Sequence, residues 1–114
     1  MPRVKRGVSH NKKRRSLMKR VKGFGGGRKN LLKQAKTADT KAGAHAYRDR
    51  RVKKRNMRSL WQIRINAGLR QLGTSYSKFM GKLKEKDIEL NRKVISELAK
   101  DYPAVFEKLV ENNK

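Results

Sequence analysis

The positive charge of this 114-residue chain is concentrated in its first half, and this asymmetry limits what the chain can fold into. Residues 1–56 contain 21 Lys and Arg against two acidic residues, a net charge of +19. Residues 57–114 contain 12 Lys and Arg against seven acidic residues, a net charge of +5. A segment as basic as the first half repels itself and cannot form the wall of an ordinary globule. We therefore expect it to need a polyanionic partner, most often a nucleic acid.

Large apolar residues are distributed the opposite way. Of the Val, Ile, Leu, Met, Phe, Tyr and Trp residues, 21 lie in 57–114 and 11 in 1–56. High charge with little apolar surface is typical of disorder, because too little burial is available to offset chain entropy. We therefore predict a basic arm over residues 1–56, disordered without its nucleic-acid partner, and a globular helical bundle over residues 57–114.

The sequence carries little that points to a metal, a membrane or catalysis. It has no cysteine, and therefore no disulfide and no thiolate metal ligand. No apolar run approaches the ~20 residues that span a bilayer, and the first 30 residues lack the apolar stretch of a signal peptide. The only histidines, His10 and His45, have no nearby pair of acids, and no nucleophile–base arrangement is apparent. We expect no enzyme activity, no cofactor, no metal, no membrane contact and no homo-oligomer.

Helix start and stop signals predict an all-α fold that begins with a broken arm. A short helix over about 10–22 follows Ser9, a favourable N-cap residue, and ends at Gly23. The glycines at 25–27 form a flexible corner before a long, proline-free helix over about 28–72. At 1.5 Å per residue this helix is ~65 Å long, so we expect part of it to project from a small globule.

The apolar stripe of the long helix changes character along its length. Its early positions are mostly alanine. Its later positions are large and fall within about 120° of one face at 100° per residue. These positions are Met57, Trp61, Ile65, Leu69 and Leu72. The last third of the helix is therefore predicted to pack in a core.

Three shorter helices complete the predicted bundle. Gly73 ends the long helix, and Ser75 and Asn91 are suitable N-cap residues for the next two. Pro103 suits the first position of the last helix. The core residues predicted from the four stripes are Trp61, Ile65, Leu69, Phe79, Leu83, Ile95, Leu98 and Phe106.

The densest run of cations lies within residues 48–58. Seven of these 11 residues are Lys or Arg, with only Asp49 to offset them, and like-charge neighbours destabilise a free helix. A solvated charged face is the structural alternative for such a run. Phosphates on several sides would relieve the repulsion, which favours insertion between RNA helices over docking in one DNA groove.

The glycine-rich corner over residues 23–29 superficially resembles a phosphate-binding loop. No Gly-Lys-Ser/Thr follows it and no apolar strand precedes it, which argues against a nucleotide-binding P-loop. Two readings stay open. The corner can let the backbone approach phosphate while Phe24 stacks or wedges, or it can be a bare turn between two helices.

The residues that we predict to bind RNA are the cations of the arm and of the first helix of the bundle. They are Arg3, Lys5, Arg6, Lys12, Lys13, Arg14, Arg15, Lys19, Arg20, Lys22, Arg28, Lys29, Arg48, Arg50, Arg51, Lys53, Lys54, Arg55, Arg58, Arg64 and Arg70.

Several stretches of the chain form one set of motifs in a single register. They are Ala46-Tyr47-Arg48-Asp49-Arg50-Arg51, Lys53-Lys54-Arg55, Leu60-Trp61, Arg64-Ile65-Asn66-Ala67 and Ser75-Tyr76-Ser77-Lys78-Phe79, with Arg3-Val4-Lys5-Arg6-Gly7, Gly23-Phe24 and Asn91-Arg92-Lys93. Together they resemble the bacterial large-subunit ribosomal protein L20 family over nearly the whole chain. The chain departs from that family in its extra glycines at 25–27 and in Asp39 within the arm.

This resemblance implies a structural protein of the cytoplasmic ribosome. Its implied partners are large-subunit ribosomal RNA, bound early in assembly, and neighbouring large-subunit ribosomal proteins. It also implies that residues 1–56 form an RNA-threading arm that enters the interior of that RNA, and that the RNA-binding bundle of residues 57–114 sits on a junction in its second domain. Some members of the family also repress their own operon mRNA. From charge alone, the alternatives are a basic DNA-compacting nucleoid protein and a ribosome-associated assembly or hibernation factor.

Overall fold

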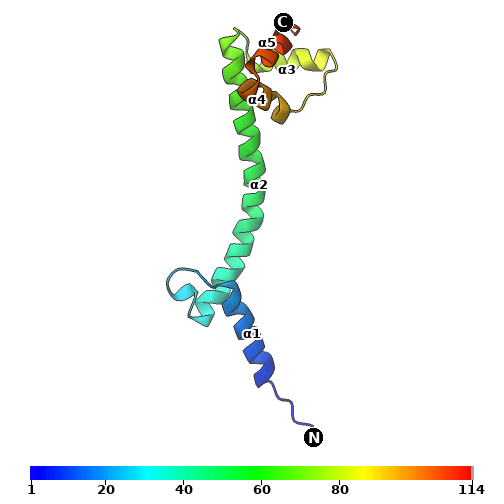
Figure 1. Ribbon diagram of the computed structural model, residues 1–114. Coiled ribbons are helices and arrows are strands. Elements are labelled where there is room, and N and C mark those ends of the chain that lie inside the picture. Colours follow the sequence, from blue (N-terminus) through cyan, green and yellow to red (C-terminus); the bar gives the residue numbers. More distant parts are fainter. Residues whose placement is uncertain (114) are drawn as a thin grey trace. The chain divides into compact units, whose positions relative to one another are not determined.

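The computed structural model describes residues 1–113, and this part of the chain folds into helices without any strand (Figure 1). The predicted order of a short helix, a glycine corner, a long helix and a small bundle is confirmed. The elements are α1 (Gly7–Arg20), the 3₁₀ helix η1 (Gly26–Arg28), α2 (Leu32–Gln71), α3 (Tyr76–Glu85), α4 (Arg92–Asp101) and α5 (Pro103–Glu111).

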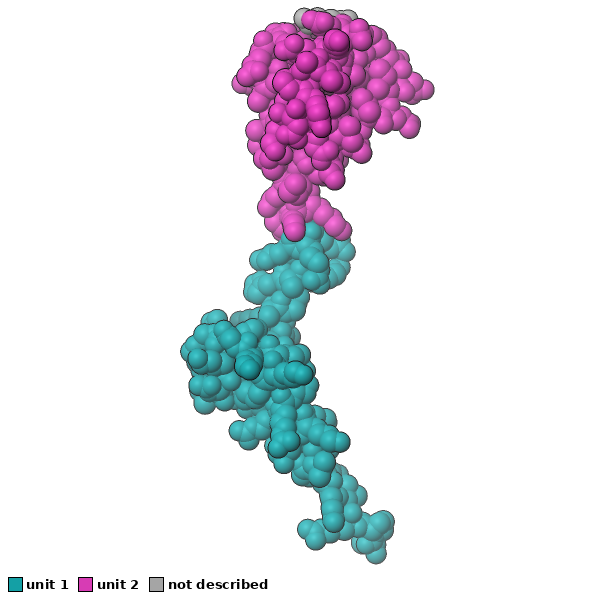
Figure 2. Space-filling model, in the orientation of Figure 1, with its two compact units in different colours: residues 1–51 teal, residues 52–114 magenta. Residues whose placement is uncertain are grey.

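The chain divides into two compact units, Met1–Arg51 and Val52–Lys114, coloured separately in Figure 2. The division falls within α2, which contributes its first part to the first unit and its last part to the second. We call Met1–Arg51 the arm unit and Val52–Lys114 the bundle unit. The boundary lies a few residues before residue 56, where the charge pattern of the sequence changes.

The helix α1 begins earlier than predicted. The His10 N–H donates to the Arg6 carbonyl at 3.0 Å, so the first helical turn forms before Ser9. Ser9 therefore lies inside α1, and Arg6 occupies the N-cap position without a side-chain capping bond. The prediction that Ser9 caps this helix is wrong, because hydrogen bonding of the preceding backbone extends the helix past it.

The glycine corner depends on backbone conformations that glycine adopts at low cost. Gly23 has φ +92° and Gly26 has φ +59°, both in the left-handed region that is strained for residues with a side chain. The first reverses the chain after α1 and the second opens η1. Because η1 occupies part of the segment predicted to be helical, α2 starts only at Leu32.

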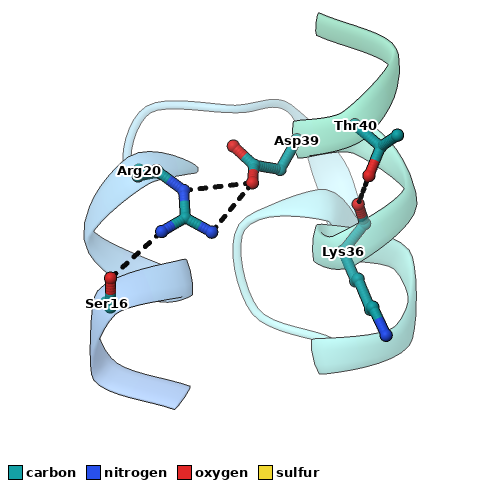
Figure 3. A network of polar contacts seen from close by, with 5 residues as sticks. All are labelled: Ser16, Arg20, Lys36, Asp39 and Thr40. Carbon is teal, nitrogen blue, oxygen red and sulfur yellow. Dashed lines mark hydrogen bonds and ion pairs between the residues drawn. The ribbon is translucent and has the colours of Figure 1, made fainter. Parts of the chain in front are cut away.

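A small apolar cluster and one ion pair hold α1 against the start of α2. The cluster buries Leu17, Val21 and Ala35, with Met18 and Phe24 packed against it. Beside it, the Arg20 guanidinium contacts Oδ2 of Asp39 through Nε and Nη2, both at 3.0 Å (Figure 3). Arg20 Nη1 also donates to Ser16 Oγ at 3.0 Å. Asp39 thus joins the two helices of the corner.

The bundle unit has a larger core, to which all four of its helices contribute. Its buried cluster contains Ile65, Leu69, Phe79, Leu83, Ile95, Phe106 and Val110. The rings of Phe79 and Phe106 lie 6.2 Å apart between centroids at an interplanar angle of 58°. Leu98 is partly buried against the cluster.

The bundle helices begin largely where the sequence signals place them. Asn91 Oδ1 accepts a hydrogen bond from the Val94 N–H at 2.8 Å, and Pro103 is the first residue of α5. Ser75 occupies the N-cap position of α3 without a side-chain capping bond. Between α3 and α4, Arg92 Nε donates to the Tyr76 hydroxyl at 2.8 Å.

Trp61 does not belong to this core. It is partly exposed and lies outside the cluster, one turn before Ile65, while Met57 is exposed. The stripe of α2 runs along one face as predicted, but the core begins at Ile65 because the cluster residues of α3–α5 pack only on the last two turns. The prediction that Trp61 is a core residue is therefore corrected.

Gly68 allows α5 to pack closely on α2. A Cβ atom at Gly68 would lie 2.9 Å from Cε1 of Phe106 and 3.6 Å from Cβ of Ala99. The Phe106 ring is buried against Phe79 and cannot swing away without disturbing the core. This contact between a backbone and a ring sets the spacing of the two helices.

We expect Gly68→Ala to lower the free energy of unfolding of the chain by up to about 2 kcal/mol. The gain in helix propensity of about 1 kcal/mol is exceeded by the cost of overpacking the core. Gly81→Ala is the matched control, since Gly81 also lies inside a bundle helix but has open space where its Cβ would be. Urea unfolding should show Gly81→Ala as stabilising, and equal effects of both variants would contradict the close contact.

The corrected position of Trp61 also has a measurable consequence. We expect Ile65→Ala, which leaves a cavity at a fully buried site, to cost about 2–5 kcal/mol of unfolding free energy. Trp61→Ala should cost clearly less despite removing a larger side chain, because Trp61 is partly exposed. Thermal unfolding of both variants tests this order. A larger loss of unfolding free energy for Trp61→Ala would indicate that Trp61 is a core residue after all.

Candidate nucleic-acid interface

The cations predicted to bind RNA all lie on the surface of their units. Every residue of that set is exposed, from Arg3 in the N-terminal segment to Arg70 near the end of α2. Within residues 1–113, Arg20 and Arg48 are the members of the set that form ion pairs with acidic side chains. Most of the positive charge therefore lies on the surface and is not neutralised by acidic side chains of the described residues.

The middle of α2 is exposed on all its faces. In the arm unit, every residue from Thr40 to Arg51 is exposed, and in the bundle unit every residue from Lys53 to Ser59 is exposed. Each stretch is longer than the 3.6 residues of one helical turn and therefore includes residues on every face of the helix. No face of either stretch is thus covered by other residues of the same unit. A globular protein normally buries one stripe of each helix, and this segment buries none.

Two local contacts orient arginines on this exposed helix. Arg51 Nη2 donates to the Tyr47 hydroxyl at 2.7 Å, and its Cζ lies 4.9 Å from the centroid of the Tyr47 ring. A guanidinium over an aromatic face is attracted by the ring quadrupole, which holds Arg51 in a defined position. Arg48 Nε contacts Asp49 Oδ1 at 2.9 Å. The sequence analysis did not predict that Tyr47 orients Arg51. The signal was present, because residues four apart on a helix are neighbours on its surface.

The bundle unit contributes a weaker positive surface. Arg64 and Arg70 project from the same helix that supplies the core, and neither pairs with an acidic residue in the part of the chain that the structure describes. The two ion pairs of α4, Lys93–Glu97 and Lys100–Asp101, lie on exposed positions. Such surface pairs contribute little to stability and leave the helical surface polar.

Other kinds of site find little support in the described residues. Residues 1–113 contain no group of three or more His, Cys, Asp or Glu side chains placed to hold a metal ion. His10 lies on α1 and His45 on α2, both exposed. None of the helices over this range is long and apolar enough to cross a membrane.

Comparison with known proteins identifies the family. The ribosomal protein L20 family model matches residues 3–109. Large ribosomal subunit protein bL20 of Flavobacterium psychrophilum and that of Flavobacterium johnsoniae are each 51% identical to this chain over 114 residues, which cover the whole of both chains. The protein of the same name from Parvibaculum lavamentivorans is 50% identical over 111 residues, covering 97% of this chain and 94% of the relative. The chain therefore belongs to the ribosomal protein L20 family, as a structural component of the large ribosomal subunit rather than an enzyme.

Proposed function

We propose that the chain binds large-subunit ribosomal RNA directly and supports early assembly of the subunit. The observation that carries this proposal is the cation-dense middle of α2, where residues 40–51 and 53–59 are all exposed. Like charges at helical spacing destabilise such a segment in water, and phosphates around it would remove that penalty. A protein helix that lies in one groove of DNA contacts the DNA with one of its faces only. Because the cations of α2 lie on every face, we favour RNA helices packed around α2 over DNA compaction.

The two units are proposed to contribute differently to binding. The arm carries most of the charge, and phosphate contacts supply affinity with little sequence information. The bundle has a rigid core and a defined surface that can discriminate the shape of an RNA junction. Repression of the chain's own operon mRNA is proposed to use the same bundle surface.

The arm is proposed to order only on RNA. Its apolar cluster buries three residues, whereas the bundle cluster buries seven in the described chain. So small a core cannot offset both the chain entropy of the arm and the repulsion within a segment of net charge +19. Folding of the arm would then be coupled to assembly, with phosphates acting as the counter-charge.

A salt series separates the contributions of the two units. A fragment of residues 57–114 keeps every residue of the bundle core but only a net charge of +5. Since each phosphate contact steepens the log–log dependence of affinity on salt by about 0.7–0.9, we expect a much shallower slope for the fragment than for the full chain. We expect the fragment still to prefer the ribosomal RNA junction over random RNA of equal length. Filter binding measures both, and equal slopes would mean that the arm does not engage this RNA.

Amide hydrogen exchange of the free, full-length protein tests the ordering of the arm. Backbone amides over residues 33–54 should exchange rapidly without RNA, because only the small cluster around Ala35 packs on that part of α2 and no core covers the residues that follow it. Backbone amides of the helices that form the bundle core should be protected from exchange even without RNA. Adding the ribosomal RNA should slow exchange over residues 33–54, and strong protection there before RNA is added would contradict coupled folding.

A further inference from the structure

The arm unit contains a groove beside the glycine corner. It has a volume of about 990 Å³ and is lined by Phe24 and Arg28 from the corner and by one face of α2, including Gln34, Ala38 and Lys41. This volume lies near the upper end of the range of about 300–1,000 Å³ that is usual for small-molecule sites. The groove is therefore large enough for a ligand of nucleotide size.

Phe24 forms a fixed aromatic wall of this groove. Its backbone N–H donates to the Val21 carbonyl at 3.0 Å, and its side chain packs against the cluster of Leu17, Val21 and Ala35. The ring is only partly buried by that packing, and its remaining surface lines the groove. The methyl groups of Ala38 and Ala42 line the α2 side, so an aromatic and apolar surface faces the interior.

Gln34 adds a polar edge, and Gly27 makes room for it. A Cβ atom at Gly27 would collide with the Gln34 carboxamide oxygen, so glycine at this position lets the corner lie directly against Gln34. The carboxamide forms no hydrogen bond with another of residues 1–113 in this structure and offers both a donor and an acceptor. An amide with free donor and acceptor groups is suited to the polar edge of a base.

The rim of the groove is basic. Arg28, Lys33 and Lys41 line it together with His45, and no acidic residue does. Asp39, the nearest acid along α2, lines a different cavity and is held there by Arg20. The site thus combines a stacking surface, an amide edge and phosphate-binding cations.

We propose that this groove binds one unpaired nucleotide of ribosomal RNA. Its base stacks on Phe24 and is contacted at its edge by Gln34, while Arg28 and Lys41 bind the flanking phosphates. Both faces of a paired base are covered inside a duplex, so only an unpaired or extruded base can enter. This inference deepens the proposed RNA-binding function and rests on it.

Full-length variants test the stacking. Phe24→Leu keeps an apolar side chain for the corner cluster but removes the flat ring, so we expect about a tenfold loss of affinity for purified large-subunit ribosomal RNA, with an unchanged salt slope. Phe24→Trp should retain wild-type affinity because it restores an aromatic face. Leu31→Ala is the matched control: Leu31 is an exposed apolar residue of the same corner that does not line the groove, and its replacement should leave affinity unchanged.

Ultraviolet crosslinking of the wild-type complex gives an independent readout. We expect a zero-length crosslink between Phe24 and a nucleotide that is unpaired in the RNA secondary structure. A crosslink from Phe24 to a paired nucleotide or to another protein would overturn the inference. So would equal affinity of wild type and Phe24→Leu, or an equal loss in Phe24→Leu and Phe24→Trp, which would indicate packing alone. Failure of the wild-type chain to bind the RNA at all would instead overturn the proposed function.

Discussion

Repulsion between the cations of α2 is the constraint to which the rest of the structure responds. Along the exposed stretches of this helix, lysine and arginine follow one another with Asp49 as the only acid, and no apolar face is available for burial. Neighbouring like charges on a helix destabilise it, and the protein itself supplies little compensation. The structure of this segment therefore makes physical sense as one half of a complex whose other half is a polyanion.

The two units meet this constraint in different ways. The bundle places its cations on the outside of a core in which α2 packs with three further helices, so its fold does not depend on neutralising them. The arm has a small cluster and relies on local polar contacts, such as the pair between Arg20 and Asp39 and the stacking of Arg51 on Tyr47. Exposed contacts of this kind are individually weak, so they direct side chains more than they stabilise the unit.

Glycine has two distinct physical roles in the chain. At Gly23 and Gly26 it supplies backbone conformations with positive φ that turn the chain from α1 toward α2. At Gly27 and Gly68 it allows a close approach, in one case of the corner to Gln34 and in the other of the Phe106 ring to α2. Gly27 thus lets the corner lie against the groove residue Gln34, and Gly68 sets the packing of the bundle.

The sequence by itself determined the all-α class, the order of the helices and the surface position of the cations, because charge density, helical periodicity and capping residues such as Asn91 and Pro103 are local properties. It also identified most of the bundle core from the four apolar stripes. Only the tertiary structure decided that the core begins at Ile65 and not at Trp61, since burial depends on how far the other helices reach along α2. The Arg20–Asp39 pair, the groove between Phe24 and Gln34, and the contact of Gly68 with Phe106 were equally beyond local reasoning, because each joins residues that only the folding of the chain brings together.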